Sequence, residues 1–308
     1  MNAPRVSVVM SVFNGAARLA ATLEALLAQT LEDFELIAVD DGSTDGTLPI
    51  LAEYARRDAR IRLVTQPNRG LTRSLINGCA VARAELIARE DCGDRSQPDR
   101  LRRQVEVFDT RHDVVLCASS VAVRAPEGEL MYTAERDGTR VRESLLHDGI
   151  RRIIGLPSHP SAMFRADAYR RAGGYREEFY FAQDLDLWIR LAPLGTIEIL
   201  GDVLHEMTFE PGAISGLARA EQVRSAEIAI ALRDATSPDE TARLLANARA
   251  IQPRARGARR RASAAGHYFI GRTLQNAGNL TAAAKYLHRA VKANPFLLRA
   301  WVALARKP

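Results

Sequence analysis

The chain has 308 residues, of which 47% are hydrophobic and 26% charged, a composition typical of a globular protein. No segment reaches the roughly 18 apolar residues that a membrane span needs. The first residues also lack the pattern of a secretory signal peptide, in which a positively charged stretch precedes an apolar one. The three cysteines, Cys79, Cys92 and Cys117, form neither a CxxC pair nor an even set, which predicts free thiols. We therefore expect a cytoplasmic protein with one large domain and a small appendage.

The net charge of +6 hides a division between the two ends of the chain. Residues 251–308 contain twelve Lys and Arg and no Asp or Glu, so they carry +12 and the first 250 residues carry −6. One interpretation is a solvated, Arg-rich helix surface; the other is attraction to an anionic partner. The segment has no nucleic-acid motif, so the expected partners are an anionic membrane surface, at the inner face of the cell membrane, or a protein, and no nucleic acid.

The first 118 residues alternate between strand and helix patterns. The apolar run Val6–Met10 predicts a strand buried on both faces, and further strands are predicted at Phe34–Val39, Ile61–Thr65, Glu85–Ala88 and Val114–Ala118. Apolar stripes of helical period predict helices at Ala16–Gln29, Thr47–Arg57, Leu71–Ala82 and Asp99–Asp109. Repeated β-α-β crossovers of this length predict an α/β fold with a Rossmann-like, mostly parallel sheet flanked by helices.

Polar residues follow four of these strands. They are Ser11 and Asn14 after the first strand, Asp40 and Asp41 after the second, Gln66 to Arg69 after the third, and Asp91 to Asp94 after the fourth. In open α/β sheets the ligand crevice lies outside the carboxyl ends of the strands. We therefore expect these side chains to share one ligand site.

Beyond residue 118 the pattern is irregular, with predicted helices at Asp184–Ala192, Arg219–Arg233 and Pro238–Ala250. A final helix pair has small residues and a proline at the spacing of a tetratricopeptide repeat, which it resembles over Ala264–Leu297: Gly271, Ala283, Ala290 and Pro295. A generic helical hairpin is the alternative. One such unit cannot bury its apolar face alone, so it must pack on the catalytic domain, another protomer or a partner.

An ordered set of motifs over residues 4–216 resembles family-2 glycosyltransferases, which have the GT-A fold. The motifs are Val6–Gly15, Gln29-Thr30, Phe34–Thr47, Asn68–Leu71, Gln97–Leu101, Phe164-Arg165, Gly173–Tyr175 and Asp184–Arg190. The resemblance implies an inverting transfer of a sugar from a nucleotide-diphosphate sugar, such as a UDP-sugar, to a glycan or lipid-linked acceptor in cell-surface glycan synthesis. It also implies a glycosyltransferase domain at 1–216, with a nucleotide-sugar half at 1–118 and an acceptor half at 119–216. The patterns beyond it predict a helical connector (217–250) and a basic tetratricopeptide-like helical region (251–308).

The resemblance assigns the donor site to residues at the first strand ends. Asp41 would meet the base, and the residues expected around it are Ser11, Phe13, Asn14, Asp40 and Arg73. A tight turn with a helix cap is the structural alternative for Asp40–Asp41, since Asp and Gly favour turns in any case.

Relatives hold Mn²⁺ or Mg²⁺ with an Asp-x-Asp motif, because hard cations prefer carboxylate and phosphate oxygens. Asp91 matches the first carboxylate, but Gly93 stands at the second position. Asp94, one residue on, can take over that role. The alternatives are that Asp91 alone binds the ion, or that the stretch is a solvated loop without metal.

The resemblance assigns the general base that deprotonates the acceptor to Asp184, with Gln183 in place of the glutamate of the family's Glu-Asp pair. Asp186 is expected to cap or support the helix, and Trp188 and Arg190 to pack the acceptor side.

Two further positions are assigned to the acceptor or pyrophosphate side. Glu210 stands where relatives have a late histidine before Pro-Gly, and His159 belongs to the segment that flanks the acceptor site. His205 is nearby in the sequence, but a lone histidine is more often structural.

Three departures at motif positions, Gly93, Gln183 and Glu210, keep open a second function: a catalytically impaired nucleotide-sugar-binding or scaffold protein that acts through its C-terminal repeat. A dinucleotide-dependent oxidoreductase is excluded, because no GxGxxG loop follows the first strand.

Overall fold

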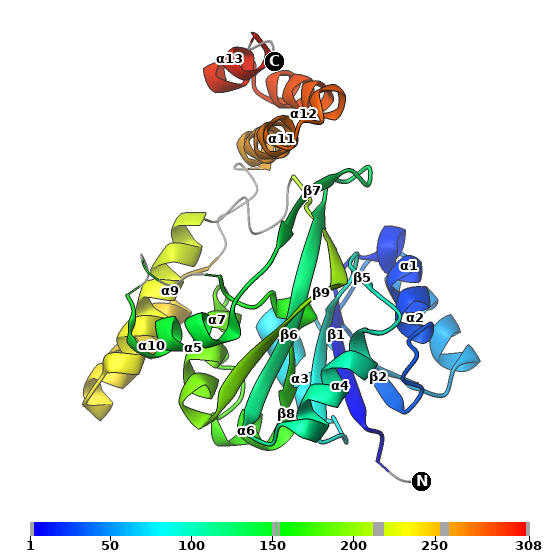
Figure 1. Ribbon diagram of the computed structural model, residues 1–308, viewed down its shortest axis with the longest axis vertical. Coiled ribbons are helices and arrows are strands. Elements are labelled where there is room, and N and C mark those ends of the chain that lie inside the picture. Colours follow the sequence, from blue (N-terminus) through cyan, green and yellow to red (C-terminus); the bar gives the residue numbers. More distant parts are fainter. Residues whose placement is uncertain (1–2, 150–151, 153–154, 212–218, 253–258, 306–308) are drawn as a thin grey trace. The chain divides into compact units, whose positions relative to one another are not determined.

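The computed structural model describes residues 3–149, 152, 155–211, 219–252 and 259–305 (Figure 1). The chain divides into two compact units. The first comprises residues 1–121, 135–206 and 224–251, and the second comprises residues 122–134, 207–223 and 252–308. No helix within the described ranges is long and apolar enough to cross a bilayer.

A mixed sheet carries the strands in the order β3-β2-β1-β4-β8-β6-β9-β5, with β7 paired to β6. Their bounds are β1 Val6–Val12, β2 Phe34–Asp40, β3 Ile61–Thr65, β4 Leu86–Asp91, β5 Arg95–Ser96, β6 Val114–Arg124, β7 Leu130–Ala134, β8 Met163–Arg165 and β9 Thr196–Thr208. Strands β3, β2, β1 and β4 are parallel to one another, whereas β8 runs antiparallel to both β4 and β6. The predicted α/β fold is confirmed, and the antiparallel pairs that β8 forms with β4 and β6, and β9 with β5, make the sheet mixed.

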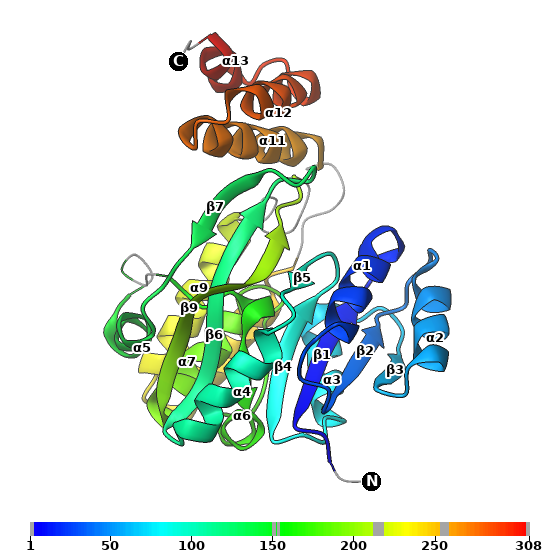
Figure 2. The same cartoon turned by 45° about the vertical axis from the view of Figure 1, so that its right-hand side comes forward.

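The helices of the first unit lie on both faces of the sheet (Figure 2). Their bounds are α1 Ala16–Leu27, α2 Thr47–Arg57, α3 Leu71–Ala80, α4 Arg100–Thr110, α5 Gly138–His147, α6 Ala166–Arg171, α7 Gln183–Leu191, α9 Arg219–Asp234 and α10 Pro238–Arg249. The predicted bounds of α2 and β3 match the observed ones, and the other predicted elements shift by a few residues at their ends, apart from β6, which runs six residues further.

Two apolar cores lie on opposite faces of this sheet because successive side chains of a strand point to opposite sides. Val8 and Met10 belong to a core with side chains of α1, α2 and α4. Val9, between them, belongs to a core with side chains of α3 and α7. Burial on both faces explains why five of the seven residues of β1 are apolar, and it leaves the strand ends as the main place for polar groups.

The second unit is built on three helices, α11 Arg259–Asn276, α12 Leu280–Ala293 and α13 Leu298–Ala305. Helices α11 and α12 approach closely at Gly271, where an added Cβ would lie 2.7 Å from Leu287 Cγ and 3.1 Å from the Ala283 carbonyl oxygen. Small residues at this crossing are therefore required by packing, as the repeat-like spacing predicts.

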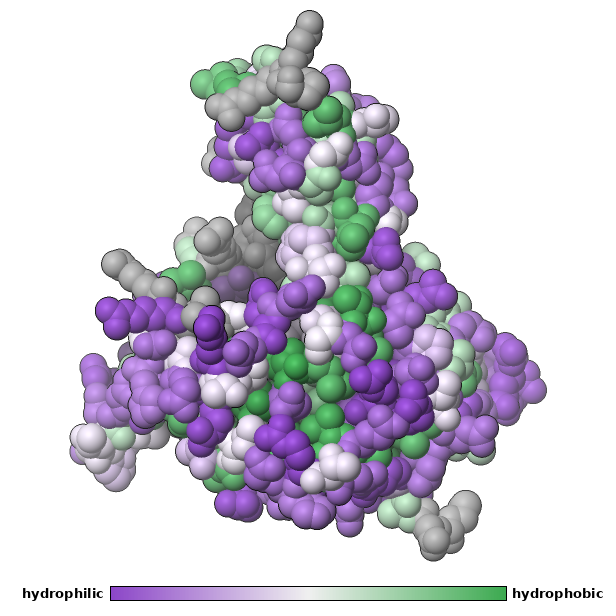
Figure 3. All heavy atoms as spheres, viewed as in Figure 1, coloured by the Kyte–Doolittle hydropathy of each residue, from purple (hydrophilic) through white to green (hydrophobic). Residues whose placement is uncertain are grey.

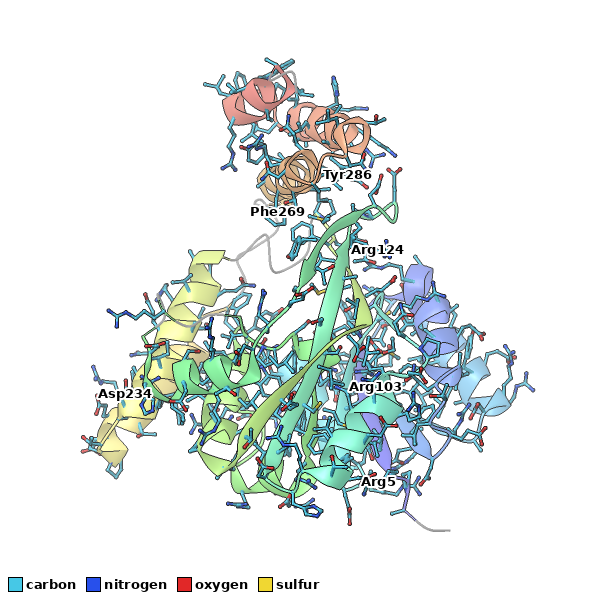
Figure 4. All side chains as sticks on the ribbon, in the orientation of Figure 1. Arg5, Arg103, Arg124, Asp234, Phe269 and Tyr286 are labelled. Carbon is cyan, nitrogen blue, oxygen red and sulfur yellow. The ribbon has the colours of Figure 1, made fainter. Side chains whose placement is uncertain are left out.

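The helix pair of the second unit packs on the hairpin formed by residues 122–134. Phe269 and Tyr286 lie on the side of the helices that faces this hairpin (Figure 4), and Tyr286 Oη donates a hydrogen bond to Glu129 Oε2 over 3.2 Å. The Phe269 ring lies 5.0 Å from that of Phe209, and Glu127 forms ion pairs with two basic side chains of α12. The helix pair thus buries one apolar face within its own unit.

Candidate active site

The carboxyl ends of four parallel strands meet at one edge of the sheet. In the register, Ser11 lies opposite Val39 on one side and Asp91 on the other, and Asp40 lies opposite Val12 and Thr65. Polar residues that follow these strands therefore emerge at the same edge, as the topology predicts.

The loops after β1 and β2 are tied together. The backbone N–H of Asn14 donates to Ser43 Oγ over 3.0 Å, and Asn14 Oδ1 accepts from the Thr44 N–H over 2.8 Å. Asn14 has φ +52°, a left-handed conformation that asparagine tolerates better than most residues. Next to it, the Phe13 ring is 52% exposed. A rigid loop pair thus presents an exposed aromatic ring at the strand ends.

The two aspartates at the end of β2, Asp40 and Asp41, are almost completely buried, each with 2% exposure. Asp41 Oδ1 accepts hydrogen bonds from Gln66 Nε2 (2.7 Å) and the Arg69 N–H (2.8 Å), and its Oδ2 accepts from the Gly70 N–H (2.8 Å). Asp41 therefore fastens the loop between β3 and α3 to the end of β2. A contact of Asp41 with a nucleotide base remains a prediction.

A segment from the second half of the chain packs against this loop. Thr72 Oγ1 donates to the Phe179 carbonyl oxygen over 2.6 Å, and a Cβ added to Gly70 would lie 3.4 Å from the Tyr180 ring. Arg73, predicted to contact the donor, forms an ion pair with Glu177. Residues 177–184 are thus held beside the strand-end edge, which brings α7 to it.

Asp91, at the end of β4, is oriented by a buried arginine. Arg89 has a fully buried side chain, and its Nη2 lies 2.5 Å from Asp91 Oδ1. Its Nη1 donates to the carbonyl oxygens of Val9 and Glu90, and its Nε donates to His159 Nε2 over 3.2 Å. The Asp91 side chain itself remains 38% exposed, so it can still meet a ligand.

His159 belongs to this buried network. Its Nε2 lies 2.7 Å from Tyr175 Oη, and desolvation together with the nearby Arg89 guanidinium holds the pKa of His159 well below its ordinary value. Since an arginine always donates, Nε2 must act as an acceptor, which fits a neutral imidazole. The structure therefore links His159 to Asp91 through Arg89.

The backbone conformation explains why a glycine stands at the position of the second motif carboxylate. Gly93 has φ +102°, a conformation that favours glycine, and an added Cβ would lie 3.2 Å from Arg18 Nε. The Gly93 N–H donates to Thr22 Oγ1, and that hydroxyl donates to the Asp94 carbonyl oxygen, each over 2.9 Å. Helix α1 thus fastens the loop in a shape that a side chain at position 93 would strain.

Within the described residues, Glu90, Asp94 and His205 form a group that could hold a metal ion, with ligand atoms within 4.8 Å of one another. His205 Nε2 lies 3.2 Å from Asp94 Oδ2 and 3.8 Å from Glu90 Oε1. Burial lowers the pKa of His205 to about 4, and burial also raises the pKa of Glu90. A neutral imidazole and two carboxylates are a donor set that suits a divalent cation such as Mn²⁺. The predicted ligand Asp94 belongs to this group, whereas Asp91 pairs with Arg89.

Asp184, the predicted base, lies in the first turn of α7. Although part of the residue reaches the surface, its carboxyl is desolvated, which raises its pKa, and the nearby negative charge of Asp91 raises it further. Asp184 Oδ1 accepts from the Leu185 N–H over 2.9 Å. Ala182, two residues before it, has φ +56°, a conformation that costs an alanine energy and that is enriched at functional sites. Asp184 and Asp91 are therefore close enough to interact electrostatically at the same edge.

The other residues predicted on α7 are structural in their contacts. Asp186, with 2% of its side chain exposed, pairs with Arg176 and Arg190. Trp188 is fully buried, with its ring edge-on to those of His159 and Phe164. Because Trp188 is fully buried, it could influence an acceptor only indirectly, through its neighbour His159.

Glu210 belongs to the second unit. Residues 212–215, which complete the Pro-Gly-Ala-Ile-Ser motif after Glu210, lie outside the described residues. The role of Glu210 on the acceptor or pyrophosphate side stays a prediction.

Sequence reasoning missed three members of the site: Arg89, Glu90 and Tyr175. The signal for the first two is that Arg89 and Glu90 directly follow the apolar residues of this strand, where a buried charge requires a partner. Tyr175 was quoted only as part of a Gly-Gly-Tyr motif, and no spacing rule connects it to His159.

Comparisons with known proteins identify the family of this chain. The model of the family "Glycosyl transferase family 2" matches residues 7–173. "Putative glycosyltransferase EpsE" of Bacillus subtilis (strain 168) is 35% identical over 192 residues, covering 61% of this chain and 66% of that protein. The chondroitin synthase of Escherichia coli is 28% identical over 204 residues, covering 66% of this chain but only 28% of the synthase.

Two solved structures share the fold. The mannosyltransferase PcManGT from Pyrobaculum calidifontis, in complex with GDP-Man and Mn²⁺, superposes with a TM-score of 0.58 at 20% identity, covering 99% of this chain and 81% of that one. S. aureus TarS 1–349 in complex with UDP superposes with a TM-score of 0.57 at 17% identity, covering 97% of this chain and 88% of that one. The family model covers more than half of the chain, and the chain therefore belongs to glycosyl transferase family 2.

Proposed function

We propose that the protein is an inverting glycosyltransferase that moves a sugar from a nucleotide-diphosphate sugar to an acceptor hydroxyl. The observation that carries the proposal is the hydrogen bond from Thr72 Oγ1 to the Phe179 carbonyl oxygen, which ties the segment leading into α7 to the loop after β3, while desolvation raises the pKa of Asp184 in the first turn of α7. A desolvated carboxylate with a raised pKa is a stronger base than an exposed one, which suits proton removal from an alcohol.

The reaction needs one base and one stabilised leaving group. Asp184 accepts the proton of the acceptor hydroxyl while that oxygen forms a bond to the anomeric carbon of the donor. The bond between this carbon and the diphosphate oxygen breaks, and its electron pair leaves with the nucleoside diphosphate. Attack from the side opposite the leaving group inverts the configuration at the anomeric carbon.

The donor would lie across the ends of β1, β2 and β4. The exposed Phe13 ring offers a flat apolar surface for a nucleobase, and Ser11 and Asn14 lie beside it. Nucleotides in two structural neighbours, UDP and GDP-Man, support a nucleoside diphosphate as the shared group. We propose a UDP-sugar as the donor.

Asp94, His205 and Glu90 would hold a Mn²⁺ or Mg²⁺ ion, and Asp91 would face the donor beside it. When bound, the ion would supply positive charge that stabilises the negative charge developing on the departing diphosphate. Arg89 orients Asp91 through the ion pair described above. The positive charge of Arg89 also offsets part of the negative charge of the carboxylates at this edge.

The acceptor side would be formed by the residues around Asp184 and His159. A growing glycan or a lipid-linked saccharide supplies the required hydroxyl, and the polysaccharide synthases among the relatives support a role in cell-surface glycan synthesis. We propose that the reaction takes place in the cytoplasm.

Donor hydrolysis tests the proposal without a known acceptor. The full chain is incubated with a set of UDP- and GDP-sugars, with Mn²⁺ or with EDTA, and free nucleoside diphosphate is measured. Mn²⁺-dependent release that the Asp184→Asn variant loses would support the transferase. Nucleotide binding without any turnover would instead favour the alternative, a nucleotide-sugar-binding scaffold.

A further inference from the structure

Helix α13 exposes an apolar stripe to solvent. Leu298, Trp301 and Val302 are 74%, 50% and 54% exposed, and their spacing of i, i+3 and i+4 places them on one face of the helix. Phe296, two residues before the helix, is 90% exposed. Figure 3 shows hydrophobic side chains at the surface where α13 lies in Figure 1.

The opposite face of α13 already has its packing partners. Ala300 and Ala303 are buried, with 0% and 3% exposure, and they face the interior of the second unit. The helix is therefore apolar on two sides, which is typical of a helix that needs a second contact surface. Single exposed apolar residues are ordinary, but four large ones next to each other mark an interaction site.

Charge indicates which partner fits this stripe. Residues 251–308 carry twelve Lys and Arg and no Asp or Glu. Lys285 and Arg289 are paired with Glu127, whereas Lys292 is exposed in the last turn of α12. Arg299 follows Leu298 in α13 and is also exposed, with its guanidinium over the Tyr268 ring. A second copy of the chain would bring the same positive charge against itself, so self-association through this face is opposed by repulsion.

We propose that α13 and Phe296 form a docking surface for an anionic lipid bilayer. The apolar stripe enters the boundary between head groups and acyl chains, and the basic side chains bind the negative head groups. Tryptophan is well suited to this boundary because its ring is apolar and its N–H is polar. The surface lies in the second unit and is independent of the proposed catalytic residues.

The chain contains its own reporter of this contact. It has two tryptophans; Trp188 is fully buried in the first unit and Trp301 is half exposed. We expect vesicles of phosphatidylcholine with phosphatidylglycerol to shift the emission of the full chain to shorter wavelength. Phosphatidylcholine alone should have little effect, and 1 M salt, where the screening length is about 3 Å, should weaken the contact.

A double variant and a matched control make the test specific. Leu298→Gln with Trp301→Gln should lower the affinity for anionic vesicles in co-sedimentation by about 10-fold or more, because two apolar side chains no longer enter the bilayer. Leu130→Gln, at a residue 46% exposed on β7 of the same unit, should leave vesicle binding unchanged. Phe296→Gln, outside any helix, provides a third variant if the double variant fails to fold, and it should also weaken binding.

Three results would overturn the proposal: no binding of the full chain to anionic vesicles, equal binding of the folded double variant, or a dimer in light scattering that the double variant abolishes while vesicles have no effect. Donor hydrolysis is measured separately, so a failure of the docking surface is distinguishable from a failure of the transferase.

Discussion

Asp41 provides a quantitative test of the strand-end edge, because its carboxylate holds three hydrogen bonds while only 2% of the residue is exposed. Asp41→Asn keeps the shape of the side chain but replaces one acceptor oxygen by a donor. Since N–H donors face both oxygens, neither orientation of the amide satisfies them all. The variant therefore loses at least one hydrogen bond to a charged acceptor and weakens the others.

The expected loss follows from these contacts. A hydrogen bond to a charged group contributes about 1.5–3 kcal/mol, and water can reach the partly exposed loop, so we expect a loss of about 2 kcal/mol in the free energy of unfolding. For a unit of this size that corresponds to a fall in Tm of about 4–8 °C.

Thermal unfolding without nucleotide measures the effect of Asp41→Asn. The matched control is Asp33→Asn, which removes the same charge from an exposed position and should change Tm by less than about 2 °C. If Asp41→Asn leaves Tm unchanged and abolishes only donor binding, the carboxylate contacts the donor and does not fasten the loop.

Three further changes test the site. Asp184→Asn should lower donor turnover by about 10²-fold or more with donor affinity kept, measured by single-turnover kinetics and calorimetry. Because desolvation raises the pKa of Asp184 and the base acts only when ionised, kcat/KM should fall with decreasing pH at values above the ~3.9 of a free aspartate, measured in a pH profile. Gly93→Asp should destabilise the fold by about 1–3 kcal/mol without strengthening Mn²⁺ binding, because φ is +102° at this position, measured by urea unfolding and calorimetry. His205→Gln should weaken Mn²⁺ binding by about 10-fold or more, measured by calorimetry with Mn²⁺ alone.

Each of these predictions has a contradicting result. Near-normal turnover in Asp184→Asn, or an acidic limb at or below pH ~3.9, would remove Asp184 as the base. Tighter Mn²⁺ binding in Gly93→Asp would show that the loop can adopt the usual motif geometry. Unchanged Mn²⁺ affinity in His205→Gln would make His205 a structural residue.

Much of the fold could be predicted from the sequence because two periods alternate clearly over the first 118 residues. Strand β1 is apolar at every buried position except Ser7, and α1 has its leucines on one stripe, so both were found with small errors at their ends. Strand β8 could not be found in this way. It has three residues, Met163–Arg165, and it exists because β4 and β6 bind it from both sides.

The site was predictable only as far as topology determines it. Asp91 and the residues after β1 and β2 meet because parallel strands end at one edge. The partners of these residues depend on contacts that no local pattern encodes. His205 lies beside Asp94 across 111 positions of sequence, and Arg89 forms an ion pair with Asp91 while its side chain is fully buried.

The central claim is that the ends of β1, β2 and β4 bind a nucleoside diphosphate with a divalent ion. Calorimetric titration of the full chain with UDP and GDP, each with Mn²⁺ and with EDTA, tests it most directly. The account predicts saturable binding of at least one of the two that EDTA weakens about 10-fold or more, since the ion contacts the diphosphate. If neither nucleotide binds with Mn²⁺ present while the protein is folded, the acidic edge of the sheet is not a donor site.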